Sequence, residues 1–222
     1  MYKSLIYKEW LKIRYFLFGY GIMIIVLTGY LFLDIRHTLA MEKPINVWLY
    51  LIQYKMLFYN MVKFIPLVGG ILLGLTQFVP EMTKNRYRLS FHLPLPEIKM
   101  LLFVVSTGFL AFLVANLIMY GGFLMITAIF YSIEIVTSAA ITMLPWFIVG
   151  FAGYFATATI VVEHSWKYRI VLMIIATGLI GLMLKEEGYE EHVFVIWQYI
   201  VIALMFAATI VFPGYRLRKG SK

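Results

Sequence analysis

EMTKNRYRLSFHLPLPEIK, running from Glu81 to Lys99, is the longest internal polar segment of a chain that is otherwise almost continuously apolar. It lies between two apolar segments that are long enough to cross a membrane, and four of its side chains are cationic: Lys84, Arg86, Arg88 and Lys99. Cationic loops between membrane spans collect on the cytoplasmic side. We therefore expect residues 81–99 to face the cytoplasm.

Prolines give this segment a predicted shape. Pro80 is expected to end the preceding span, because proline lacks a backbone donor and clashes with the previous turn. Residues 81–91 contain neither Gly nor Pro, so they can form about three helical turns. The run Leu93-Pro-Leu-Pro96 cannot continue a helix, whereas Pro96 suits the first turn of the next one. The sequence predicts a short helix, an extended link and a long span.

The composition places the whole chain in a membrane. Of its 222 residues 63% are hydrophobic and only 14% are charged, with a mean hydropathy of +0.88. A soluble domain of this length could not bury so much apolar surface. Cysteine is absent, which excludes disulfides and thiolate ligands. The net charge of +8 fits basic residues at a membrane surface, and we expect no nucleic-acid partner.

Apolar segments predict an all-α integral membrane protein with one transmembrane domain, residues 1–222, crossing the bilayer six times. A basic amphipathic segment at 3–14, with Trp10 at the interface, reads as an elbow helix lying on the membrane or as the flank of the first span. Residues 34–55 are expected to form a mixed outer loop. Gly121 and Gly122 could interrupt the long third span. The predicted spans cover about 15–33, 58–79, 100–131, 141–162, 170–184 and 193–212.

Basic residues predict the orientation. Four of the 19 Lys and Arg residues lie in the N-terminal segment, four in residues 81–99, two in residues 163–169 and four in the tail. The other five, Arg36, Lys43, Lys55, Lys63 and Lys185, fall at or near the opposite side. By the positive-inside rule both termini should be cytoplasmic, in the cytoplasmic (inner) membrane.

Catalytic and metal-binding patterns are missing from the sequence. The four histidines lie on separate loops, and there is no HExxH, GxSxG or Gly-Lys dipeptide, hence no phosphate loop. We expect no enzyme activity, no metal site and no cofactor bound by this chain. Asn116 could contact a substrate or hydrogen-bond to a neighbouring helix, and Gly70 and Gly74 have the spacing of a close helix contact. The acidic run at residues 186–191 could bind a cation or be a solvated loop.

The pattern RYRLSFHLPLPEIKMLL, from Arg86 to Leu102, resembles the first cytoplasmic loop of type-two ABC exporter permeases. In residue detail the resemblance covers about residues 81–99, and in topology it covers the whole chain. It implies an exporter subunit that pairs with a second copy or a homologous permease and with P-loop ATPase subunits, which would bind the ATP and Mg. The rival interpretation is an ATPase-independent membrane scaffold or accessory subunit of a larger complex.

The resemblance also implies which residues meet the ATPase. Residues 81–91 would form the coupling helix that sits in a cleft of that subunit, and residues 163–169 would make a second, smaller contact. The alternative is that both are ordinary basic flanks of membrane spans. The expected contact residues are Glu81, Arg86, Tyr87, Arg88, His92, Glu163, His164 and Lys167.

Overall fold

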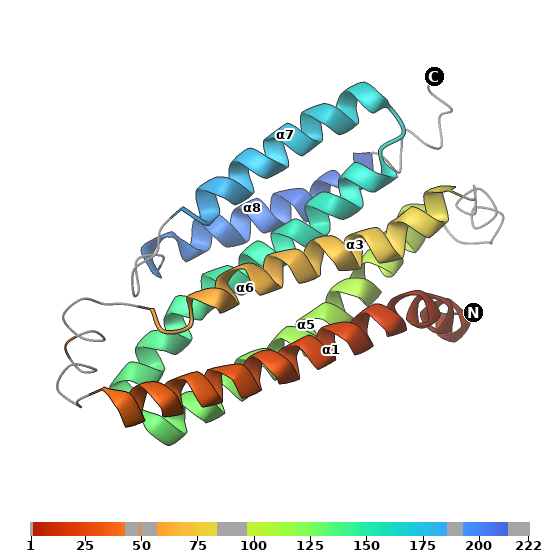
Figure 1. The fold of residues 1–222 in the computed structure, drawn as a ribbon. Coiled ribbons are helices and arrows are strands. Elements are labelled where there is room, and N and C mark those ends of the chain that lie inside the picture. The colour runs from red at the N-terminus through yellow and green to blue at the C-terminus, as the bar shows by residue number, and fades with distance from the viewer. Residues whose placement is uncertain (1, 43–48, 50–56, 84–96, 186–192, 213–222) are drawn as a thin grey trace.

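The computed structural model describes residues 2–42, 49, 57–83, 97–185 and 193–212, and it is a bundle of long helices (Figure 1). Within these ranges there is no β-strand, so the predicted all-α class is confirmed for the described chain. The elements are α1 (Tyr2–Met41), η2 (Asn60–Phe64), α3 (Ile65–Thr83), α5 (Glu97–Phe130), α6 (Ile133–Val162), α7 (Trp166–Met183), η3 (Val193–Val195) and α8 (Ile196–Thr209).

Five stretches of the described chain are long and apolar enough to cross a membrane: Lys3–Met41, Asn60–Met82, Lys99–Phe130, Ile133–Val162 and Trp166–Met183. They indicate a multi-pass membrane protein. The sixth apolar helix, α8, has 14 residues. That is roughly 21 Å of helix, shorter than the ~30 Å hydrocarbon core. The sixth crossing therefore stays a prediction.

Helix α6 lies at the centre of the bundle. It is the most buried of the five long helices and packs against α3, α5, α7 and α8. Helix α1 covers α5 and α3 on the outer side (Figure 1). Most of α7 is exposed, and its apolar side chains suit contact with lipid.

Small residues let α3 and α6 approach closely. A Cβ atom added at Gly70 would overlap the carbonyl oxygen of Gly150, and one added at Gly150 would lie 2.7 Å from the carbonyl oxygen of Pro66. One added at Gly74 would lie 2.9 Å from Cβ of Thr157. Gly70 and Gly74 thus lie in a helix contact, where backbone meets backbone as small-residue motifs allow.

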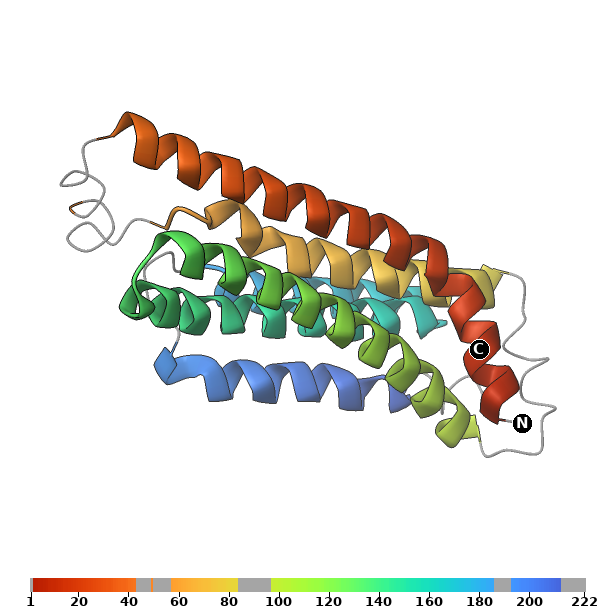
Figure 2. The ribbon, with the colours of Figure 1, turned by 90° about the horizontal axis from the view of Figure 1, so that it is seen from below.

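The observed bounds of helix α1 show that two predicted boundaries were wrong. It is continuous from Tyr2 to Met41, so the predicted 3–14 segment is not a separate helix, although its first turns bend away from the rest (Figure 2). It also runs through Asp34, where the outer loop was expected to begin. The physical reason is that residues 2–41 contain no proline. Their glycines 19, 21 and 29 each cost about 1 kcal/mol relative to alanine, too little to end a long helix.

Three further boundaries differ from the prediction. Helix α3 continues through Pro80 to Thr83. A proline in the last turn removes only one helical hydrogen bond, and Glu81 beyond it is held by ion pairs with α1. Helix α5 is unbroken at Gly121 and Gly122, because a glycine pair costs little within so apolar a helix. Helix α6 begins at Ile133 rather than near residue 141, so only two residues separate it from α5.

Candidate functional site

One end of the bundle collects most of the described basic residues. The start of α1, the end of α3, the start of α5 and the turn between α6 and α7 lie at this end (Figures 1 and 2). We call it the basic end and define it by residues 2–14, 77–83, 97–100 and 162–169. Its cationic side chains are Lys3, Lys8, Lys12, Arg14, Lys99, Lys167 and Arg169.

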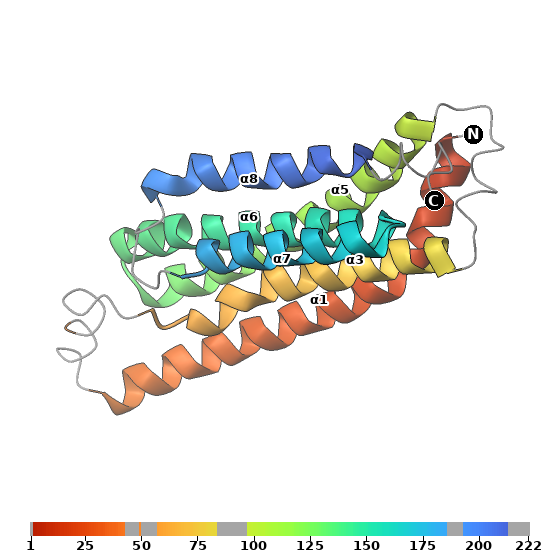
Figure 3. The same cartoon turned by 90° about the horizontal axis from the view of Figure 1, so that it is seen from above.

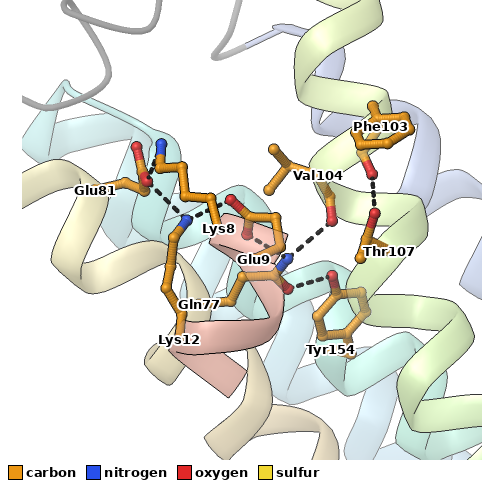
Figure 4. Close-up of polar contacts among 9 residues, drawn as sticks. All are labelled: Lys8, Glu9, Lys12, Gln77, Glu81, Phe103, Val104, Thr107 and Tyr154. Carbon is orange, nitrogen blue, oxygen red and sulfur yellow. Dashed lines mark hydrogen bonds and ion pairs between the residues drawn. The ribbon is translucent and has the colours of Figure 1, made fainter. Parts of the chain in front are cut away.

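Glu81 is bound by two lysines of α1. Its Oε1 lies 2.9 Å from Lys8 Nζ and 2.7 Å from Lys12 Nζ, and the residue is only 3% exposed (Figure 4). A carboxylate near the end of a helix faces the negative pole of the helix dipole, which disfavours it. The two ammonium groups offset that repulsion. The Glu81 carboxylate therefore joins α3 to the first turns of α1.

A chain of hydrogen bonds continues from this ion cluster into the bundle. Lys12 Nζ also lies 2.6 Å from Glu9 Oε1, and Gln77 Nε2 donates to Glu9 Oε2 at 3.1 Å. The same Gln77 nitrogen donates to the carbonyl oxygen of Val104 at 2.8 Å, and the Tyr154 hydroxyl donates to Gln77 Oε1 at 2.8 Å (Figure 4). These contacts connect α1, α3, α5 and α6. We call them the basic-end network.

Gly108 makes room for this network. A Cβ atom at this position would overlap Gln77 Oε1 and the Tyr154 hydroxyl oxygen. Both side chains are buried, and unsatisfied polar groups in such a place are costly. The glycine in α5 therefore allows Gln77 and Tyr154 to satisfy each other between α3 and α6.

Sequence reasoning missed Glu9, Gln77 and Tyr154 as members of one network. A signal was present, because Gln77 and Glu81 are separated by four residues in an apolar segment and so share one helix face. Lys8, Glu9 and Lys12 likewise lie within little more than one turn. The sequence pattern did not show against which helix α1 would pack.

The turn between α6 and α7 holds the predicted second contact. Glu163 is buried, its Oε1 accepts a hydrogen bond from the Ser165 backbone N–H at 3.1 Å, and its carbonyl oxygen accepts one from Arg169 at 2.7 Å. These bonds fix the turn. His164 and Lys167 are exposed beside it. Of the three residues expected to make this contact, His164 and Lys167 therefore expose their side chains, whereas Glu163 does not.

The other predicted residues fall into two groups. Asn116 lies inside the bundle, where its Oδ1 accepts a hydrogen bond from the Tyr20 hydroxyl at 3.1 Å and its amide donates to the Phe112 carbonyl oxygen at 2.8 Å. It joins α1 to α5, as Gly70 and Gly74 join α3 to α6. Arg86, Tyr87, Arg88 and His92, like the acidic run 186–191, lie outside the described residues.

Among the described residues no three His, Asp or Glu side chains are grouped so as to hold a metal ion. Comparisons of the chain with protein-family models, with curated proteins and with solved structures gave no match. The functional assignment therefore rests on the residues of the basic end and on the sequence pattern.

A double-mutant cycle can measure how much the ion pair between Glu81 and Lys12 contributes to the free energy of unfolding. We expect Glu81→Gln and Lys12→Gln each to lower the free energy of unfolding by about 2 kcal/mol. This loss is smaller than for a fully buried ion pair, because Lys8, the other lysine bound to Glu81, is partly exposed. The double variant should lose about 1 kcal/mol less than the sum, since both changes remove one contact. Thermal unfolding of the purified protein in detergent gives these values. Lys3→Gln, at an exposed position of the same helix, is the control; strict additivity of the two changes would show that the ion pair contributes nothing.

Proposed function

We propose that the chain is the membrane-spanning permease subunit of an ATP-driven ABC exporter. Two permease subunits, a second copy or a homologue, would form the translocation pathway, and two separate P-loop ATPase subunits would drive it. Each permease would cross the membrane six times, with α8 and its flanking residues as the last crossing. The positive-inside rule then places the basic end and both termini in the cytoplasm, where ATP is available.

One observation supports the proposal: the basic-end network connects four helices near the end of α3, the helix that residues 84–96 follow in the sequence. Glu81, three residues before this segment, is bonded to α1. One turn earlier Gln77 is bonded to α1 and α5 and accepts from Tyr154 of α6. A push on residues 84–96 would therefore be passed to α1, α3, α5 and α6 at once, as switching between two arrangements of packed helices requires.

Within this proposal the predicted contact residues have different roles. Glu81 and Glu163 are buried and would hold the two cytoplasmic links in place. The exposed His164 and Lys167, with Arg86, Tyr87, Arg88 and His92, would meet the ATPase. ATP and Mg would be bound by that subunit, and this chain would bind no cofactor.

Photo-crosslinking from the basic end tests this arrangement. A photoreactive amino acid at His164 or Lys167 should join this chain to a P-loop ATPase subunit in the purified native complex. The same amino acid at Ile133 or Thr137, which are exposed at the opposite end of α6, should not. The outcome also tests the orientation, because the ATPase is cytoplasmic. A functional complex that reproducibly contains no ATPase would contradict the proposal and favour the scaffold or accessory subunit.

A further inference from the structure

An apolar groove of about 530 Å³ runs along the start of α5. The first turns of α5 lie beside the end of α8, with α6 behind them (Figures 2 and 3). The groove is lined by Lys99, Leu102, Phe103, Val105, Ser106, Phe109, Phe155 and Ala207. Phe109 and Phe155 stack at its inner end, with ring centroids 5.4 Å apart.

Two lining side chains are polar, Ser106 and Lys99, and one of them already uses its proton within its own helix. The Ser106 hydroxyl donates to the Phe103 carbonyl oxygen of its own helix at 3.0 Å. Lys99 is exposed at the mouth of the groove and forms no ion pair with another described residue. The lining therefore offers one cation at one end and apolar surface along the rest.

The length of the groove along α5 matches the thickness of the hydrocarbon part of one membrane leaflet. From Lys99 to Phe109 the rise along α5 is roughly 15 Å. That is half of the ~30 Å hydrocarbon core. If the basic end lies at the membrane surface, Lys99, the first residue of the candidate span Lys99–Phe130, would lie at the level of the lipid headgroups, and Phe109 would lie deeper in the hydrocarbon core. A lysine at that level can place its charged head at the interface and its stem along apolar surface.

We propose that this groove binds one acyl chain of an anionic phospholipid, with the headgroup phosphate on Lys99. The apolar lining and leaflet depth suit an acyl chain, and the single cation at headgroup level selects a negative headgroup. The sequence flanking both helices is also basic, with Lys84, Arg86 and Arg88 before α5 and four Lys and Arg residues after α8. Basic segments next to a membrane helix favour anionic lipids. This site requires only that the chain spans a membrane, and it does not depend on the exporter proposal.

Photo-labelling with defined lipids tests the site. The purified full chain is placed in nanodiscs that contain phosphatidylglycerol or phosphatidylcholine with a diazirine in the acyl chain, and the labelled peptides are identified by mass spectrometry. We expect labelling of residues 102–109 and of Phe155 or Ala207, several-fold stronger with phosphatidylglycerol. Lys99→Gln should reduce this preference about fivefold, the effect of one lysine near an anionic surface. Lys167→Gln, which removes a cation elsewhere at the basic end, should leave the preference unchanged.

Two filling variants separate groove binding from general lipid contact. Ala207→Phe and, at an exposed lining position, Ser106→Trp should each remove most of the labelling of residues 102–109. Ala208→Phe, at the next residue of α8 and not in the lining, should not. Size-exclusion chromatography shows which variants are folded, and either filling variant suffices. The proposal is overturned if a folded filling variant labels like the unchanged protein, if Lys167→Gln lowers the preference as much as Lys99→Gln, or if a photoreactive residue at position 106 joins two copies of the chain.

Discussion

Replacing Gly70 with alanine is expected to lower the free energy of unfolding by about 3 kcal/mol, the upper part of the range for overpacked sites. The added methyl group would overlap the carbonyl oxygen of Gly150, a backbone atom that no change of rotamer can move. Either α3 or α6 must shift as a whole. Because α6 is the central helix of the bundle, a shift at this contact disturbs the packing of α5, α7 and α8 as well.

Gly121→Ala is the matched control for this change. Gly121 lies in α5, and a Cβ atom added there meets nothing within 4 Å. Alanine should therefore be neutral or stabilise the protein by up to about 1 kcal/mol through its better helix propensity. Both variants are compared by thermal unfolding in the same detergent. If Gly70→Ala melts like Gly121→Ala, α3 and α6 do not touch through their backbones at this point.

The helical, membrane-embedded character of the chain was predictable because composition and the length of apolar segments report it directly. The residues at which the helices end were harder to predict. From the sequence alone Pro80 is expected to end the helix. Helix α3 nevertheless continues past it, because Lys8 and Lys12 of a distant helix hold Glu81 in place. Such a tertiary contact outweighs local propensity and leaves no trace in the local sequence.

The candidate site was predictable only in part, because it too depends on contacts between distant helices. The sequence singled out Glu81 as the first residue of the polar segment 81–99, but it did not show the direction of its side chain, which lies against α1. Gln77 and Tyr154 are 77 residues apart in sequence, and only the packing of α3 on α6 brings them together. The exposure of His164 and Lys167 was easier to predict, because polar and charged residues between two apolar spans are expected at a surface.

The largest expected effect on activity comes from reversing charge in the segment that follows α3. In a purified complex with the proposed ATPase subunits, we expect Arg86→Glu together with Arg88→Glu to abolish most of the substrate-stimulated ATP hydrolysis while leaving membrane insertion intact. At the proposed docking surface two cations would become two anions, so attraction would be replaced by like-charge repulsion. The control is Arg36→Glu together with Lys185→Glu, the same change of charge at exposed positions at the opposite end.

Substrate-stimulated ATP hydrolysis by the complex that carries Arg86→Glu and Arg88→Glu is therefore the decisive measurement. If a separate ATPase drives this chain through residues 81–99, hydrolysis falls to near its unstimulated rate in that complex and stays unchanged in the Arg36→Glu, Lys185→Glu complex. Full stimulation in the complex with both changed arginines would contradict the assignment of this segment as the coupling element.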